Sequence, residues 1–149
     1  MKNKTPFNDI FSSSITAGEA SHKAVDRAEF SLNVKFPKEY RDFLEAFGAL
    51  IGDDFEIAGV FDSSEDEPPI WKHIVNTTKQ FRRMTGGNIS NALIPISDDG
   101  SGKVFYLDTS NPFGAVYCYG PGLDGKKVAE SFKEFVVKLA NGGRVSPCI

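Results

Sequence analysis

The sequence predicts one α+β domain, and three observations lead to this fold class. The chain has 149 residues, a length typical of a single domain. Hydrophobic residues make up 40% and charged residues 25%, which is usual for a soluble globular protein and too apolar for a disordered one. The periodicity of apolar residues predicts two helices, a strand, a helix, three strands and a last helix, an order typical of α+β domains.

Two helices are predicted near the start of the chain. The first covers residues 21–33 and has one apolar stripe, formed by Val25, Ala28 and Leu32. Pro37 is well placed as the first residue of the second helix, because its fixed φ angle suits that position. Gly48 ends this second helix. Its apolar residues recur at helical spacing and are Tyr40, Phe43, Leu44 and Phe47.

The middle of the chain predicts a strand, an acidic loop and a helix. Apolar side chains alternate over residues 54–61, with Phe55, Ile57 and Phe61 on one side of the strand. Residues 62–69 form the loop, which ends in two prolines. The helix covers residues 70–84 and is followed by Gly86-Gly87. Its apolar face consists of Trp71, Ile74, Val75, Thr78 and Phe81.

The second half predicts three strands and a helix. Pro95 indicates that the strand at 93–97 lies at a sheet edge or contains a bulge, since proline cannot donate a hydrogen bond to a neighbouring strand. The strands at 104–107 and 115–119 are nearly continuous apolar runs, as expected of strands covered on both faces. A hairpin loop joins the first two strands. Ser131 and Glu134 resemble a capping box, which predicts the start of the last helix.

We predict a core built from the inward side chains of these elements. Ten residues lie on the inward face of a predicted helix or within a covered strand and are therefore assigned to the core: Tyr40, Phe43, Leu44, Phe47, Phe105, Leu107, Val116, Phe132, Phe135 and Leu139.

No catalytic sequence motif is complete. Residues 97–104 only superficially resemble a phosphate-binding loop, because Ser97 replaces the first glycine and Val104 replaces the final Ser or Thr. His22 and His73 are isolated in the sequence and are expected at the surface or at helix ends. A catalytic base whose partners come from elsewhere in the fold stays an open alternative. We predict no enzymatic activity and no cofactor.

The two cysteines exclude a disulfide scaffold. Cys118 is expected to be a buried thiol and Cys148 a thiol of the C-terminal tail, in a reducing compartment. The cysteines and histidines lack the close pairs that zinc sites use, so we predict no metal. No apolar run approaches the length of a membrane span, and no apolar segment follows the basic start of the chain. A cytoplasmic protein without a membrane partner is the expectation.

The distribution of charge is the most informative feature. The chain has 17 basic and 20 acidic side chains, a net charge of −3, which disfavours direct binding of nucleic acid. Residues 53–67 contain no base and carry acids that we interpret either as a solubility loop or as a docking surface for a basic partner. These candidate binding residues are Asp53, Asp54, Glu56, Asp62, Glu65, Asp66 and Glu67.

Three blocks together resemble a known family. Residues 34–48 are similar to the "hydrophobic-Pro-x-x-Tyr-x-x-Phe-Leu … Gly" signature of the SUKH superfamily, the Smi/Knr domain. Residues 93–102 are similar to its "Leu-Ile-Pro-Ile-Ala-x-Asp-Gly-x-Gly" block, and residues 114–117 and 128–135 to its last strand and helix. Lys103 and residues 47–49 depart from the pattern in loops. The resemblance covers about residues 20–140 of a single SUKH-like domain at 1–149, with short extensions.

The resemblance implies a central, mainly antiparallel sheet flanked by helices, and a binding domain without a shared catalytic centre. It favours a bacterial immunity protein that binds and neutralises a cognate polymorphic or contact-dependent toxin domain. A basic nuclease would suit an acidic inhibitor. The alternative is a non-enzymatic regulatory or scaffold domain of the Smi/Knr type, related to the cell wall or to signalling. A small enzyme is a third hypothesis, which needs a deep pocket with converging titratable groups.

Overall fold

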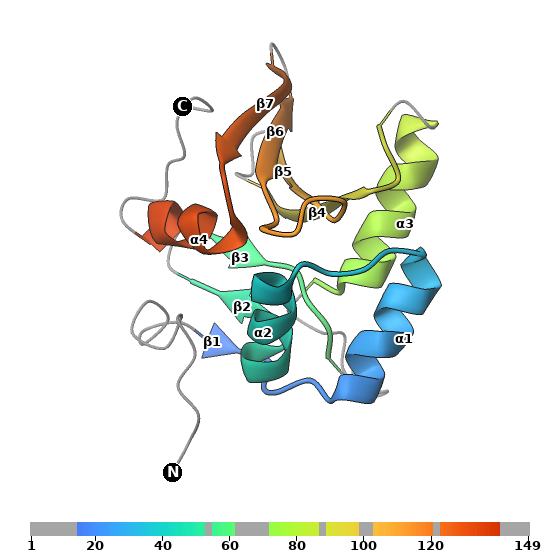
Figure 1. The fold of residues 1–149 in the computed structure, drawn as a ribbon, viewed down its shortest axis with the longest axis vertical. Helices are drawn as coiled ribbons and strands as arrows, with labels where there is room; N and C mark the ends of the chain where they lie inside the picture. The colour runs from blue at the N-terminus through green and yellow to red at the C-terminus, as the bar shows by residue number, and fades with distance from the viewer. Residues whose placement is uncertain are drawn as a thin grey trace.

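Helices and two antiparallel sheets make up the described part of the chain (Figure 1). The structure is a computed structural model, and it describes residues 15–52, 55–61, 72–86, 89–98, 103–120 and 123–140. The α+β class with antiparallel strands is confirmed. The strands divide between a small sheet and a larger one.

The small sheet has the order β1-β2-β3 and consists of β1 (Ile15–Thr16), β2 (Leu50–Ile51) and β3 (Glu56–Ile57). The larger sheet has the order β4-β5-β6-β7 and consists of β4 (Leu93–Asp98), β5 (Val104–Asp108), β6 (Val116–Gly120) and β7 (Leu123–Ala129). The register shifts between Pro95 and Ser97, so the predicted edge position and bulge of β4 are both confirmed. The two sheets meet where the backbone N–H of Ala58 donates to the carbonyl of Ile96 at 2.8 Å.

The helices are α1 (His22–Leu32), α2 (Lys38–Phe47), α3 (Ile74–Thr85) and α4 (Phe132–Ala140). Two helices cover opposite faces of the larger sheet (Figure 1). Phe105 of β5 packs on Phe135 of α4 with ring centroids 5.1 Å apart. The next residue, Tyr106, packs on Phe81 of α3 at 5.9 Å. Since successive side chains of a strand point to opposite faces, α3 and α4 sandwich the sheet.

Capping residues explain where the first two helices begin and end. The Ser21 side chain accepts a hydrogen bond from the Ala24 N–H at 3.1 Å, and Asn33 ends α1 in the left-handed region at φ 57°. Pro37 is the residue before α2 rather than its first helical residue, and Gly48 follows the helix at φ 76°. These caps fix the short elbow that joins α1 to α2.

The predicted core is confirmed, with one residue at its margin. Tyr40 and Phe43 of α2 and Phe132 of α4 have no exposed surface. Their rings lie 5.2 Å (Tyr40 to Phe132) and 5.5 Å (Phe43 to Phe132) apart in edge-on contacts. Phe47 is only partly buried and packs against the edge of this cluster. The other predicted core residues are buried.

Several element boundaries differ from those that we predicted. Within the predicted strand 54–61, the structure assigns only Glu56–Ile57 to a strand, and residues 53–54 lie outside the described residues. The helix predicted from residue 70 begins at Ile74, because His73 is extended and pairs with Gly59 in a parallel bridge. The strands β1, β2 and β7 were not predicted. Trp71 lies outside the described residues.

The expectation of a free thiol at Cys118 is wrong. Cys118 is fully buried in β6, as predicted, but it is disulfide-bonded. Cys148 is the only other cysteine of the chain and lies outside the described residues. The spacing of two cysteines along a sequence carries no information on the distance between their sulfur atoms, which is why the pattern misled us.

Candidate partner-binding surface

The residues that flank positions 62–71 are hydrogen-bonded to each other. The N–H of Gly59 donates to the carbonyl of Lys72 at 2.9 Å, and the N–H of Ile74 donates to the carbonyl of Gly59 at 2.7 Å. The chain positions on either side of residues 62–71 are therefore held together at the start of α3. Of the seven candidate binding residues, the structure describes only Glu56; the other six lie outside the described residues: Asp53, Asp54, Asp62, Glu65, Asp66 and Glu67.

Glu56 belongs to an ion-pair trio that the sequence did not predict. The Lys72 ammonium lies 3.1 Å from Oε1 of Glu56 and 2.8 Å from Oδ2 of Asp98. These residues come from β3, from the residue pair before α3, and from the end of β4. Hydrogen bonding to Asp98, and less strongly to Glu56, raises the pKa of Lys72 against the opposing effect of desolvation. The trio is only partly exposed and carries one negative charge in excess.

A cavity of about 210 Å³ opens beside this trio. It lies between β3, β4 and α3, so the two sheets and the helix share its walls. The Ser97 hydroxyl donates to the carbonyl of Glu56 at 2.7 Å and holds β3 against β4 there. Apart from the trio, its lining residues are Ala58, Thr77, Gln80, Phe81, Pro95, Ile96, Ser97 and Val104.

An aromatic row continues from the cavity across the face of the larger sheet that α3 covers. The register pairs Tyr106 with Tyr117 and Val104 with Tyr119, which places the three tyrosines on one face. Phe81 packs on Tyr106 at 5.9 Å, and Tyr106 on Tyr119 at 5.1 Å. Burial raises the pKa of Tyr106 to about 12. The Phe81 wall of the cavity is therefore held in place by packed aromatic rings.

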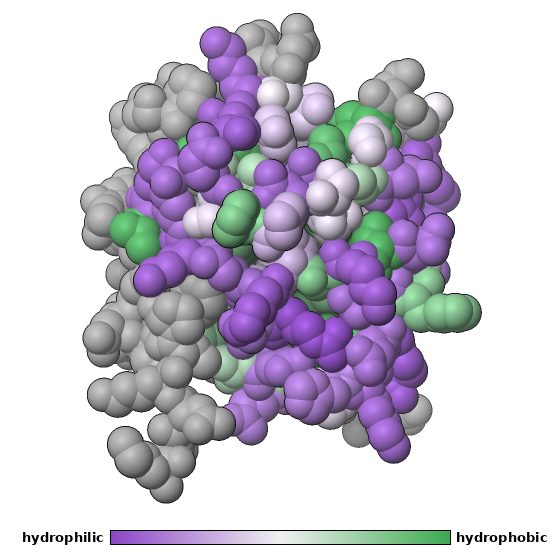
Figure 2. Space-filling model, viewed as in Figure 1, coloured by the Kyte–Doolittle hydropathy of each residue, from purple (hydrophilic) through white to green (hydrophobic). Residues whose placement is uncertain are grey.

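Large apolar side chains are not gathered into one exposed patch in the view of Figure 2. Hydrophilic residues cover most of the described surface there, and hydrophobic residues form small separate areas. Among the described residues the exposed large apolar side chains are Ile15, Phe30, Met84 and Phe113, which come from four different segments. This face therefore offers charge and hydrogen bonding rather than a broad apolar surface.

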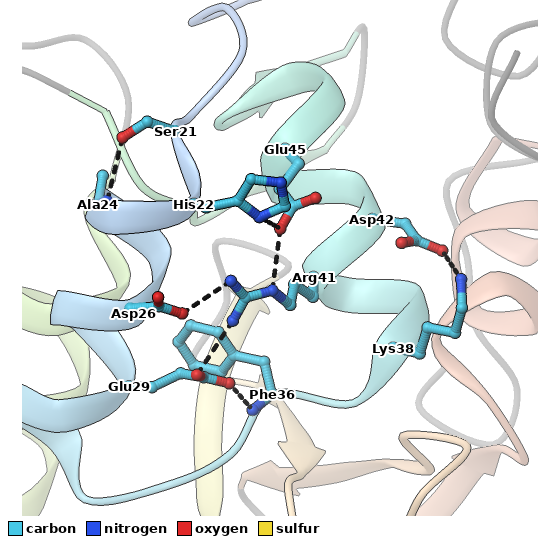
Figure 3. Close-up of polar contacts among 10 residues, drawn as sticks. All are labelled: Ser21, His22, Ala24, Asp26, Glu29, Phe36, Lys38, Arg41, Asp42 and Glu45. Atoms are coloured by element: carbon cyan, nitrogen blue, oxygen red, sulfur yellow. Dashed lines mark hydrogen bonds and ion pairs between the residues drawn. The ribbon is translucent and has the colours of Figure 1, made fainter. Parts of the chain in front are cut away.

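A second polar cluster joins α1 to α2 (Figure 3). The Arg41 guanidinium contacts Asp26 at 2.8 Å, Glu29 at 3.1 Å and Glu45 at 2.9 Å. The other oxygen of Glu29, a side chain only 8% exposed, accepts the N–H of Phe36 at 2.6 Å. Hydrogen bonding to Arg41 lowers the pKa of Asp26. The arrangement is a clamp across the helix elbow, in which one guanidinium contacts carboxylates from both helices.

The two histidines lie at the starts of α1 and α3. The His22 side chain is 79% exposed and lies 2.9 Å from Glu45. His73 precedes α3, and its Nδ1 accepts the N–H of Val75 at 3.2 Å, so it acts as a helix cap. Both positions agree with the surface and helix-end placement that we predicted. Within the described ranges, no group of three or more His, Cys, Asp or Glu side chains could hold a metal ion.

Comparison with known proteins identifies the family. The profile of the SMI1 / KNR4 family (SUKH-1) matches residues 19–138, which is most of the chain. The chain belongs to this family. The SUKH resemblance drawn from three sequence blocks is thereby confirmed. No curated protein matches the chain.

A solved structure shares this SUKH-1 fold. It is described as a crystal structure of a protein from Pseudomonas syringae pv. tomato, and it is similar to this chain with a TM-score of 0.64. The match covers 92% of this chain and 88% of the other, at 14% sequence identity. At that identity the likeness concerns the fold alone. Among the described helices of our structure, none has the length and apolar character needed to cross a bilayer.

Proposed function

We propose that this protein is an immunity protein that binds a cognate toxin domain and neutralises it by protein–protein contact. Membership in the SMI1 / KNR4 family is the observation that carries the proposal, because it supports a domain of the immunity type or of the Smi/Knr type. The proposal places the protein in the cytoplasm, where a toxin delivered by a polymorphic or contact-dependent system would act. It assigns the protein no catalytic role and no cofactor.

The acidic residues are the proposed contact surface for the toxin. They are Asp53, Asp54, Glu56, Asp62, Glu65, Asp66 and Glu67, a segment with no Lys or Arg. A basic toxin, such as a nuclease, would be attracted to this segment from a distance, and like-charged partners would be rejected. The placement of Glu56 beside Lys72 and Asp98 supports a polar contact at the edge of this surface.

The same family membership supports one alternative, a regulatory or scaffold domain of the Smi/Knr type. The genetic context separates the two functions. A neighbouring gene for a secreted effector with a variable C-terminal toxin domain favours immunity. An isolated locus beside genes of wall synthesis favours regulation.

Growth rescue tests the proposed function. The toxin domain of the neighbouring effector is expressed from an inducible promoter with and without this protein. We expect growth to stop with the toxin alone and to be restored when the protein is present. A toxin domain from an unrelated effector serves as the specificity control. Failure to restore growth with soluble, folded protein would reject the immunity function.

A further inference from the structure

We propose that the cavity between β3, β4 and α3 receives one arginine side chain of a protein partner. The inference rests on the proposed function, since it takes the toxin domain as that partner. It adds a specific contact that neither the family nor the acidic segment assigns. It uses only those lining residues that belong to the described part of the chain.

The size of the cavity suits a single side chain. Its volume is about 210 Å³. Sites for cofactors and other small molecules usually measure about 300–1,000 Å³, so this cavity falls below that class. A side chain presented by a folded partner needs only to bury its outer half. The cavity therefore has room for a single side chain.

The charge at the mouth selects a cation. Glu56 and Asp98 are each 35% exposed, and Lys72 is 46% exposed, so all three side chains reach solvent beside the cavity. Two carboxylates face one ammonium, which leaves one negative charge in excess. An anionic side chain would be repelled there. The Lys72 ammonium already shows that a cation is held between these carboxylates at 2.8–3.1 Å.

The walls favour arginine over lysine. Phe81 offers an aromatic ring, and Pro95, Ile96 and Val104 offer aliphatic surface for the stem of the side chain. A guanidinium is planar, stacks on aromatic rings and binds carboxylates through several N–H groups, whereas an ammonium is compact and strongly hydrated. Phe81 packs on Tyr106, which in turn packs on Tyr119, so the Phe81 ring is already positioned before binding.

Lys72 then acts as a competitor for the incoming arginine. Both cations interact with Glu56 and Asp98, so removing the lysine charge should strengthen binding of arginine. Removing the Glu56 charge should weaken it. These opposite effects follow from the two carboxylates that both cations contact. A change in net charge alone would not show that the effects arise in this cavity.

An NMR titration of the isolated protein tests the pocket without the toxin. The probes are N-acetyl-arginine methylamide, the lysine analogue, and the neutral citrulline analogue, which keeps the shape of arginine without its charge. We expect arginine to shift the amide signals of Thr77, Phe81 and Ser97, citrulline to leave them unshifted, and lysine to bind more weakly. Lys72→Met should tighten arginine binding by about two- to five-fold, and Glu56→Gln should weaken it by a similar factor.

The outcomes separate this inference from the proposed function. Absence of arginine-dependent shifts at these amides, equal binding of citrulline or lysine, or a Lys72→Met variant that binds arginine no better would overturn the pocket. None of those results would contradict the proposed immunity function, which growth rescue tests separately. In the complex with the toxin domain, Glu56→Gln should speed dissociation and Lys72→Met should slow it. Unchanged dissociation in both folded variants would also overturn the inference.

Discussion

At the scale of single residues, Arg41 holds α1 to α2 through carboxylates of both helices. Asp26 and Glu29 come from α1, and Glu45 comes from α2. Glu29 is nearly buried, and its carboxylate contacts Arg41 and accepts the N–H of Phe36. Arg41 and Glu29 did not stand out in the sequence, because the elbow between the two helices is what brings them together.

Replacing Arg41 should destabilise the protein. Arg41→Met leaves the Glu29 carboxylate without its cation, and we expect a loss of about 1–3 kcal/mol in the free energy of unfolding. Lys38→Met is the matched control, since it removes an exposed pair with Asp42 and should cost less than about 1 kcal/mol. Urea denaturation of both variants measures the difference. Equal stabilities of the two variants would contradict the role assigned to the clamp.

Phe43 is the residue on which the core prediction depends most. Its ring is fully buried and contacts Phe132 of α4. We expect Phe43→Ala to cost about 3–5 kcal/mol, as is usual when a buried ring is removed. Thermal and urea unfolding provide the measurement. An unchanged midpoint would remove Phe43 from the core.

At the scale of elements, periodicity predicted the helices well and the short strands poorly. The helices at 22–32, 38–47 and 132–140 carry apolar stripes and caps, which are local signals. The strands β1 and β2 have two residues each, too few for an alternation to appear, and β3 has two of the eight residues over which an alternation predicted a strand. β7 contains Asp124, Gly125, Lys126 and Lys127, a composition typical of a turn. It becomes a strand because β6 pairs with it.

The candidate site was predictable only in part. Its acidic character could be read from composition, and Glu56 was among the residues proposed. Lys72 and Asp98 were missed, because their ion pairs join residues that are distant in sequence. The cavity forms only where β3, β4 and α3 pack together, and no local sequence pattern predicts that packing.

Substitution of Gly59 tests how closely its backbone approaches that of Gly48. A Cβ atom there would overlap the carbonyl of Gly48, a backbone atom that cannot easily move. We expect Gly59→Ala to destabilise the protein by about 1–3 kcal/mol through overpacking. Asn76→Ala, on the exposed side of α3, should change stability by less than about 0.5 kcal/mol and serves as the control. A Gly59→Ala protein as stable as that control would show that the backbones do not meet there.

At the scale of the whole molecule, the disulfide at Cys118 links stability to redox conditions. Reduction removes a cross-link from the unfolded chain, and we expect it to lower stability by about 2–4 kcal/mol. The measurement is the unfolding midpoint with and without dithiothreitol, with reduction verified by thiol titration. Cys118→Ala should make the midpoint independent of the reductant. An unchanged midpoint in fully reduced wild-type protein would show that the bond contributes nothing to stability.

The proposed function is that of a small binding domain that uses charge to find its partner. The family and the fold supply the scaffold, and Gly59 and Lys72, which flank residues 62–71, are hydrogen-bonded to each other at the start of α3. The central claim is that this segment steers the toxin into contact.

The association rate across a salt series tests this claim most directly. Wild-type protein and a variant with Asp62, Glu65, Asp66 and Glu67 replaced by Asn or Gln are mixed with the toxin domain at increasing ionic strength. We expect fast wild-type association that slows as salt rises, because salt screens the attraction. The variant should associate more slowly at low salt and respond less to salt. An unchanged association rate and salt slope, in a variant that remains folded, would contradict the claim.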